Sequence, residues 1–365
     1  MLFCVPKSHN NLLPWVDLIR ENGLDIEFLV IRKNIVHTQE VTDLPGSYWL
    51  VNAVRKFKMF KDPAKAIDLF FLPRISFLWK KIRNDDVTSV FVRFNIGFFF
   101  LATLAVTFFA RKKLVLYSQG PFLSNKSYFK KIIAASVDLF FSGIWVTPVY
   151  YKEYGSDKPN HGLIRYSTFV PFFFRSPNER KEIVQNLELS VIILGKFIKR
   201  KRHLEILKTI QEQGSGNIHF DFFGEINFEE QSYYNACVDF VAKNNMSNVV
   251  LHKNVTYADI QEGMKNYDIL VLMSDDETCS FSQLEAMANG LAVIINADNG
   301  SANYVVHDVN GFIVRPGEYD RVISYLKKLD EDRPLMNGFK MNSVELMNGY
   351  ESIARSMMRN ENLFR

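Results

Sequence analysis

Hydrophobic runs and polar segments alternate regularly along this chain of 365 residues. Short apolar runs predict buried strands, and the longer segments between them show the spacing of amphipathic helices. In the first half we predict strands at residues 2–5, 26–31, 89–94, 114–118, 137–142 and 163–170. Helices are expected at 10–22 and 96–110, and residues 43–83 are expected to be helical and rich in loops.

The second half repeats this alternation more cleanly. We predict strands at residues 191–194, 219–223, 249–252, 269–273, 292–295 and 311–314. Helices are expected at 203–213, 228–243, 257–265 and 282–289, and one or two more over 341–362. Strands that alternate with helices indicate an α/β class with mostly parallel sheets, covered on both faces. We therefore predict two doubly wound, Rossmann-like domains that face a central cleft.

A boundary between the two domains is expected near the middle of the chain. Val170-Pro171 and the segment Arg175-Ser-Pro-Asn178 combine proline with polar residues, which stop regular structure. We predict an N-terminal domain over residues 1–172 and a C-terminal domain over 173–345. Residues 346–365 are expected to form a helix that packs back on the N-terminal domain.

Composition limits the function classes. Hydrophobic residues make up 47% of the chain, which excludes a disordered protein, and a net charge of +4 gives no reason to expect nucleic acid as a partner. Three widely spaced cysteines predict neither disulfides nor a metal site and suit a reducing cytosol. The N-terminus does not read as a secretory signal. The longest apolar stretch, residues 96–110, is too short for a spanning helix, which needs about 20 residues.

The most informative segment is residues 274–290, where an apolar strand breaks into a polar loop and then a helix. Glu277 lies in the loop and Glu285 in the first turns of the helix. Carboxylates at the carboxyl end of a strand, beside a helix N-terminus, suit a ligand that carries hydroxyl and phosphate groups. A metal is not expected, because Asp275 and Asp276 have no third ligand nearby in the sequence.

Glu285 also has a purely structural interpretation. Ser282-Gln-Leu-Glu285 fits a capping box, in which the glutamate reaches back to the start of the helix, and Ser280 with Gln283 offers a second register. The two interpretations are compatible if one carboxylate oxygen caps the helix and the other binds a ligand.

A basic cluster follows the predicted strand at 191–194. Six of the eight residues after Gly195 are basic or histidine. Cations are unfavourable beside a helix N-terminus, so an anion such as a nucleotide diphosphate would offset their repulsion. A solvated helix start and a patch for nucleic acid are the alternatives. The loop 298–303 either brings backbone amides to the same ligand or is an ordinary connection.

Taken in order, these segments resemble the retaining glycosyltransferases of family 4, which have the two-domain GT-B fold. The resemblance covers roughly residues 191–314 and is most specific in Glu277-x7-Glu285-Ala-Met-Ala-Asn-Gly290. Further matches are Gly195-Lys196 with Lys201, Phe222-Phe-Gly224-Glu225, Asn248-Val-Val-Leu-His252, Asn299-Gly300 and Asn310-Gly311. The chain departs from the family at Thr278-Cys279-Ser280, where glycines usually flank an aromatic residue.

The resemblance implies a role for each matching position. Lys196 and Lys201 would bind the donor diphosphate, Glu277 hydroxyls of the transferred sugar, and Glu285 the ribose hydroxyls. Backbone N–H groups around Cys279, Ser280 and Phe281 would hold the distal phosphate. The expected catalytic residues are Glu277, Lys196, Lys201 and Gln119. The expected donor-binding residues are Gly195, Lys196, Lys201, Gly224, His252, Glu277, Thr278, Cys279, Ser280, Phe281 and Glu285.

The N-terminal half matches the family poorly. His9, Ser118 and Gln119 are the candidates for the acceptor side. Gln119 stands where many relatives carry a histidine, and it can donate a hydrogen bond but cannot titrate. His9 is either an acceptor-side residue or an exposed histidine in a loop.

The implied activity is a retaining hexosyl transfer from a nucleotide-diphosphate sugar to a hydroxyl of a glycan or lipid-linked acceptor. Bacterial lipopolysaccharide, capsule or glycolipid synthesis is the expected setting. The departing diphosphate would help to deprotonate the acceptor, so no metal or other cofactor is expected. The predicted location is cytoplasmic, at the inner face of the membrane. A non-hydrolysing sugar-nucleotide epimerase and an inactive nucleotide-binding partner subunit are the alternatives.

Membrane contact is a separate question. Residues 52–83 contain nine basic and two acidic residues, together with large apolar side chains between Phe60 and Trp79. This combination suits an anionic membrane surface, although the same apolar residues also suit a core. For residues 96–110 we favour a buried core helix.

Overall fold

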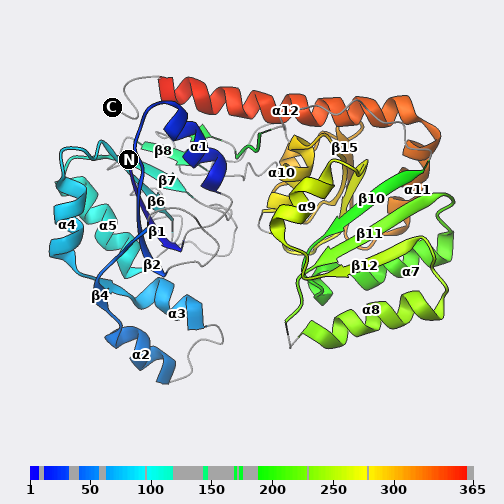
Figure 1. The fold of residues 1–365 in the computed structure, drawn as a ribbon, viewed down its shortest axis with the longest axis horizontal. Helices are drawn as coiled ribbons and strands as arrows, with labels where there is room; N and C mark the ends of the chain where they lie inside the picture. The colour runs from blue at the N-terminus through cyan, green and yellow to red at the C-terminus, as the bar shows by residue number, and fades with distance from the viewer. Residues whose placement is uncertain are drawn as a thin grey trace. The chain divides into compact units, whose positions relative to one another are not determined.

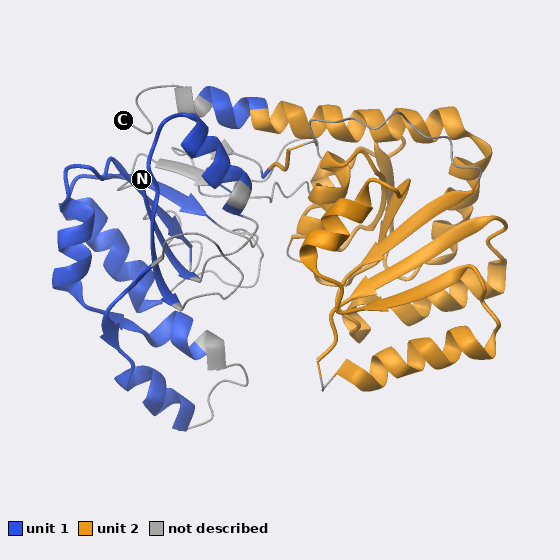
Figure 2. Ribbon diagram, viewed as in Figure 1, with its two compact units in different colours: residues 1–172, 352–365 blue, residues 173–351 orange. Residues whose placement is uncertain are grey.

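The computed structural model describes residues 1–7, 12–32, 41–56, 63–94, 97–117, 143–146, 168–170, 172–175, 188–227, 230–277 and 279–359. The chain forms two compact units, which Figure 2 colours separately. Unit 1 comprises residues 1–172 and 352–365, and unit 2 comprises residues 173–351. Each unit is built on a parallel sheet with helices, as the alternation of strands and helices predicted.

The sheet of unit 1 has the strand order β3-β2-β1-β6-β7-β8-β9, and every neighbouring pair is parallel. The strand order reverses between β1 and β6, which makes their carboxyl ends the switch point of this sheet. The strands are β1 (Leu2–Lys7), β2 (Glu27–Arg32), β3 (Val41–Asp43), β6 (Ser89–Arg93), β7 (Lys113–Tyr117), β8 (Gly143–Val146) and β9 (Thr168–Val170).

Helices and one short antiparallel pair complete unit 1 (Figure 1). The helices are α1 (Leu13–Glu21), α2 (Trp49–Lys56), α3 (Pro63–Phe70), α4 (Ile75–Arg83) and α5 (Phe98–Phe109), and the pair is β4 (Gly46–Ser47) with β5 (Leu72–Pro73).

The apolar helix α5 belongs to the core of unit 1. Phe99, Phe100 and Leu104 are buried in it, and the buried hydroxyls of Thr103 and Thr107 donate to carbonyls one turn earlier. Among the residues described, no helix is long and apolar enough to cross a membrane. The interpretation of this segment as a core helix is therefore confirmed.

The apolar residues between Phe60 and Trp79 divide between the core and partly exposed positions. Phe71 and Leu78 are fully buried, and Phe77 and Trp79 pack against the core while remaining partly exposed. Phe60 lies outside the described residues. Core packing therefore explains the apolar character of most of this segment.

The sheet of unit 2 has the strand order β12-β11-β10-β13-β14-β15, and every neighbouring pair is parallel. Its order reverses between β10 and β13, so ligands are expected at the carboxyl ends of these two strands. The strands are β10 (Leu189–Leu194), β11 (Ile218–Gly224), β12 (Val249–Lys253), β13 (Ile269–Leu272), β14 (Ala292–Asn296) and β15 (Gly311–Val314).

The helices of unit 2 pack on this sheet (Figure 1). Leu207, Cys237 and Ile323, from α7, α8 and α11, lie in one apolar cluster with residues of the strands. All residues of β14 are buried, which explains its continuous apolar run. The helices are α7 (His203–Gln213), α8 (Gln231–Lys243), α9 (Tyr257–Met264), α10 (Phe281–Ala288), α11 (Asp320–Glu331) and α12 (Arg333–Arg359), of which the residues from 352 onward belong to unit 1.

Some predicted elements differ from the structure. The strand expected at 137–142 lies outside the described residues, and the next strand, β8, was not predicted. Helix α11 was also missed, although Val322, Ile323, Leu326 and Leu329 have helical spacing and are all buried. Helix α12 begins at Arg333 rather than near 341, because its first turns are amphipathic and contribute Met336 and Phe339 to the core.

Candidate functional site

Two glycines shape the switch point of the unit 2 sheet. A Cβ added at Gly224 would lie 2.5 Å from the carbonyl oxygen of Gly195 and 2.5 Å from the ring of Phe197. A Cβ added at Gly195 would lie 3.0 Å from the side chain of Lys201. Only glycine at 224 permits this close approach of the ends of β10 and β11, and Gly195 leaves space in which the Lys201 side chain packs.

A cavity of about 650 Å³ opens at these strand ends, within unit 2. This volume falls in the range of small-molecule sites. Of the residues expected at the donor site, five line the cavity: Gly195, Lys196, Lys201, Gly224 and Glu285. The other lining residues are Leu194, Phe223, Glu225, Ile226, Asn227, Asn254, Val255, Tyr257, Ile260, Gln261 and Ser282.

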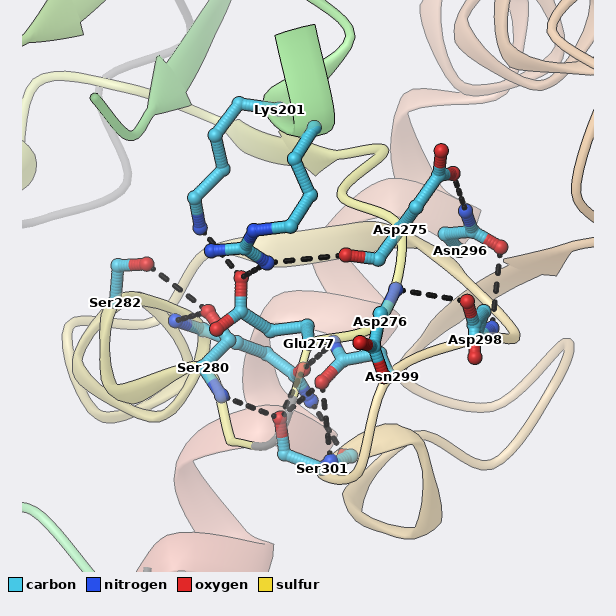
Figure 3. Close-up of polar contacts among 12 residues, drawn as sticks. Lys201, Asp275, Asp276, Glu277, Ser280, Ser282, Asn296, Asp298, Asn299 and Ser301 are labelled. Carbon is cyan, nitrogen blue, oxygen red and sulfur yellow. Dashed lines mark hydrogen bonds and ion pairs between the residues drawn. The ribbon is translucent and has the colours of Figure 1, made fainter. Parts of the chain in front are cut away.

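Glu277 forms an ion pair with Lys201, one of the cavity-lining residues (Figure 3). The Nζ atom of Lys201 lies 2.5 Å from Oε2 of Glu277, and the two side chains are only 13% and 11% exposed. Arg200 donates to the same carboxylate oxygen at 3.1 Å and to the carbonyl of Asp275 at 3.0 Å. One largely buried carboxylate therefore holds two cations at the switch point, a pairing that was not predicted from the sequence.

Arg202 fixes the end of the basic cluster. Its backbone is left-handed, with φ of 58°, and its Nε atom donates to Oδ2 of Asp275 at 2.5 Å. Hydrogen bonds to Asp275 and then to Glu205 raise the pKa of the Arg202 guanidinium. Left-handed backbone is unfavourable for arginine, so these contacts maintain a strained conformation beside the Lys201–Glu277 pair.

The loop 298–301 supports the Glu277 loop instead of presenting its amides to the cavity. Glu277 donates its N–H to the carbonyl of Asp298 at 3.2 Å, and Gly300 donates to the carbonyl of Glu277 at 2.7 Å. Asp276, with φ of 46°, donates its N–H to Oδ2 of Asp298 at 2.7 Å. Of the two interpretations of this loop, the structural one fits these contacts.

The start of α10 is capped by Ser280, whose Oγ accepts a hydrogen bond from the N–H of Gln283 at 3.3 Å. The N–H of Ser280 donates to Oγ of Ser301 at 3.0 Å. This N–H was predicted to bind the distal phosphate, and in this structure it is already occupied. Phosphate binding by the N–H groups of Cys279 and Phe281 stays a prediction. Cys279 is buried, and neither residue is among those that line the cavity.

Glu285 does not cap the helix. Its Oε1 atom accepts a hydrogen bond from the hydroxyl of Tyr257, and Oε2 accepts one from the side-chain amide of Gln261, both at 2.9 Å. The capping-box interpretation of Glu285 is therefore wrong, as is its combination of capping with ligand binding. In the second predicted register, Ser280 is the N-cap and accepts a hydrogen bond from the N–H of Gln283. Burial raises the pKa of Glu285 to about 7, although the hydrogen bonds from Tyr257 and Gln261 oppose that shift.

Two of the remaining donor-site candidates have other partners. His252 binds Asp221 at 2.6 Å, stacks on Phe223 and is not among the cavity-lining residues. Its proposed donor role therefore has no support from the geometry. Lys196 lines the cavity and forms an exposed ion pair with Glu225 at 3.1 Å.

The four other candidates, His9, Ser118, Gln119 and Thr278, lie outside the described residues.

Sequence reasoning missed Tyr257 and Gln261. The two residues are four positions apart on α9 and therefore lie on one helix face. This spacing is the feature of the sequence that could have indicated a shared partner. No group of side chains suited to a metal ion occurs among the residues that the structure describes.

Residues 176–345 match the family model described as glycosyl transferases group 1. This segment contains the cavity and the Lys201–Glu277 pair, and the match supports a glycosyltransferase. No curated protein matches the chain in sequence.

Solved structures resemble the chain over almost its whole length. HepE from Anabaena covers 99% of this chain, and 98% of HepE is covered, at a TM-score of 0.70 and 16% identity. A glycosyltransferase from Rickettsia africae has a TM-score of 0.70 at 12% identity, with 99% of this chain and 96% of that one covered. WaaG, a glycosyltransferase involved in lipopolysaccharide biosynthesis, has a TM-score of 0.59 at 14% identity, with 98% and 99% covered. These similarities confirm the predicted GT-B fold.

Proposed function

We propose that this protein is a retaining glycosyltransferase that moves a hexosyl unit from a nucleotide-diphosphate sugar to a hydroxyl group. The observation that carries the proposal is the Lys201–Glu277 pair beside a cavity of about 650 Å³ at the switch point of the unit 2 sheet. A lysine and a carboxylate in contact provide, side by side, a cation for a diphosphate and an acceptor for sugar hydroxyls.

Lys201 and Lys196 are the proposed ligands of the diphosphate. Three donor hydrogens on each ammonium allow a lysine to keep its glutamate partner while it binds a phosphate oxygen. Negative charge grows on the diphosphate as the bond to the sugar breaks, and cations already in place stabilise that charge. The departing phosphate oxygen then accepts the proton of the attacking hydroxyl, so the diphosphate itself supplies the base.

The named relatives support the choice of donor and setting. HepE has been solved with UDP, with UDP and glucose, and with UDP-glucose. WaaG acts in lipopolysaccharide biosynthesis. We propose a nucleotide sugar as donor and a glycan or lipid-linked acceptor of bacterial surface polysaccharide or glycolipid synthesis, without a metal or nucleic acid.

Acceptor binding by unit 1 is part of this proposal, with His9, Ser118 and Gln119 as its candidate residues. Three helices of unit 1 expose large apolar side chains. Trp49 on α2 is 70% exposed, Ile75 on α4 51%, and Phe109 on α5 71%. Basic residues occur in the last turn of α2 and α4 and just after α5, a combination that favours an anionic membrane surface at the inner face of the cell membrane.

Incubation of the full-length protein with nucleotide sugars tests the activity. A thermal-shift screen of UDP-, GDP- and ADP-sugars should identify the donor by its stabilising effect. NMR spectroscopy with an acceptor glycan should then show transfer with retention at the anomeric carbon. Conversion of the donor sugar without acceptor would establish the epimerase instead, and binding without turnover would establish the inactive subunit.

Flotation with liposomes tests the membrane part separately. Binding to vesicles that contain anionic lipid at low salt, reduced by Trp49→Ser and Phe109→Ser, is the expected result. No binding at low salt would contradict it.

A further inference from the structure

Glu285 lines the cavity, and its carboxylate is held by two neutral donors from a single helix. Its residue is only 8% exposed. Tyr257 and Gln261 bind one oxygen each, both at 2.9 Å. All three residues line the cavity, so this arrangement lies beside the space that a ligand would occupy.

The bonding capacity of the carboxylate leaves room for a ligand. An ionised carboxylate has about four acceptor positions, two on each oxygen. Tyr257 and Gln261 each occupy one position on a different oxygen. With respect to the residues that the structure describes, one position per oxygen therefore remains, and two adjacent oxygens with one position each match a pair of neighbouring hydroxyl groups.

The family resemblance already implies that Glu285 binds ribose hydroxyls. We propose, beyond this, that Tyr257 and Gln261 are positioning residues, whose hydrogen bonds orient the Glu285 carboxylate toward the 2′- and 3′-hydroxyls. The site would therefore select ribonucleotides over 2′-deoxyribonucleotides. This inference rests on the proposed function, because it assumes that a nucleotide occupies the cavity.

The neutral character of both donors matters for this role. A cation would bind the carboxylate strongly and compete with hydroxyl groups, whereas a phenol and an amide fix its orientation and leave its charge available. Tyr257 is the titratable group that contacts Glu285, and Lys196, Lys201 and Glu225 line the same cavity. Because the two hydrogen bonds lower the pKa of Glu285 against the effect of burial, loss of either donor should raise this pKa further.

The experiment uses isothermal titration calorimetry with the full-length protein. UDP, GDP, ADP and CDP are titrated first, and the diphosphate that binds best is compared with its 2′-deoxy form. A missing hydroxyl leaves one buried acceptor position unfilled, so the deoxy form should bind about tenfold more weakly to the wild type.

Tyr257→Phe and Gln261→Met should reduce this ribose preference at least threefold. Both substitutions should also move the midpoint of the pH dependence of binding to higher pH. Tyr267→Phe is the matched control, because the Tyr267 hydroxyl donates to the carboxylate of Asp221 at 3.0 Å and Tyr267 is not among the cavity-lining residues. This control should leave both the preference and the midpoint unchanged.

The possible outcomes separate the two proposals. If both variants bind the nucleotide with wild-type ribose preference and pH midpoint, the positioning role is overturned while the proposed function stands. If Tyr267→Phe alters both quantities as much as Tyr257→Phe, the effect is structural and the role is again overturned. If no diphosphate binds the wild type, the nucleotide site itself is rejected.

Discussion

Glu277 and Glu285 lie eight residues apart near the carboxyl edge of the same sheet, and their surroundings are opposite. Both are nearly buried, with the side chain of Glu277 11% exposed and the residue Glu285 8% exposed. Glu277 contacts the cations of Lys201 and Arg200. Among the described residues, the carboxylate of Glu285 contacts only neutral donors, and burial raises its pKa to about 7.

The comparison shows that partners, more than depth of burial, decide what each carboxylate can do. Paired cations make a buried carboxylate part of a polar framework. Burial without a cationic partner raises the pKa of Glu285 to about 7, although its two neutral donors oppose that shift, so a ligand or a proton can change its state. We infer that Glu277 orders the cations that bind the diphosphate and that Glu285 accepts hydrogen bonds from the ribose hydroxyls.

The largest expected effect comes from removing Lys201. Lys201→Ala should lower kcat/KM for transfer by about 10²- to 10³-fold, because a preorganised cation opposite the developing charge is lost. Stability should fall much less, since Arg200 still pairs with Glu277. Steady-state kinetics and urea denaturation measure the two effects.

Lys199 provides the control, because it is exposed in the same turn and does not line the cavity. Lys199→Ala should leave turnover within a few fold of wild type. Wild-type turnover in Lys201→Ala would sink the assignment of this lysine.

Charge removal at the two glutamates should separate their functions. Glu285→Gln should weaken nucleotide binding about tenfold, because an amide offers one acceptor oxygen in place of two. Glu277→Gln should reduce transfer while nucleotide binding is retained, because Lys201 and Arg200 remain but lose their ordering partner. Calorimetry with UDP or the best-binding diphosphate, alongside turnover, would contradict the comparison if both variants behaved alike.

The pH dependence of binding distinguishes the two carboxylates more finely. The pKa of Glu285 is raised to about 7, so nucleotide affinity should increase from pH 6 to pH 8 as this group ionises. Glu285→Gln should abolish this increase, and Glu277→Gln should keep it. A flat wild-type profile would contradict the assignment.

The same shift affects stability with a defined sign. A carboxyl group whose pKa is raised on folding binds more protons in the folded state, so its contribution to stability is lost as pH rises from about 4.5 to about 7. Urea denaturation of Glu285→Gln should therefore show higher stability relative to wild type at pH 8 than at pH 5.

The smallest expected effect concerns His203, a basic group whose pKa shift on folding also makes stability depend on pH. Burial, and next the charge of Lys201, lower the pKa of His203 to about 3, and its ring nitrogens have no hydrogen-bond partner among the described residues. Its contribution to stability is therefore lost as pH falls from about 6.5 towards 3. His203→Leu should flatten the acid side of the stability curve in urea denaturation, and an unchanged slope would contradict this account.

Much of the fold could be predicted because both sheets are parallel and buried on both faces. Fully buried strands such as β13 and β14 appear in the sequence as continuous apolar runs. The sequence placed Lys201 and Glu277 at the same donor site, but their direct pairing became evident only from the adjacency of β10 and β13 in the sheet.

The environment of Glu285 could not be predicted. Its two partners lie 28 and 24 residues earlier, on a helix whose orientation only the tertiary structure defines. The local sequence offered two capping registers, and contacts of Ser280 and Gln283 with Ser301 accompany the register that forms. Local patterns thus located the site, whereas long-range packing determined the partner of each carboxylate.

The left-handed backbone of Arg202 has a consequence for how this sequence can change over evolutionary time. A glycine at position 202 would remove the backbone strain but would also remove the guanidinium that binds Asp275. Asp275 would then lose its ion pair with residue 202. The neighbouring Arg200 could not fully replace it, because Arg200 already pairs with Glu277. Positions 202 and 275 are therefore coupled in sequence space, and lineages that change one are expected to change the other.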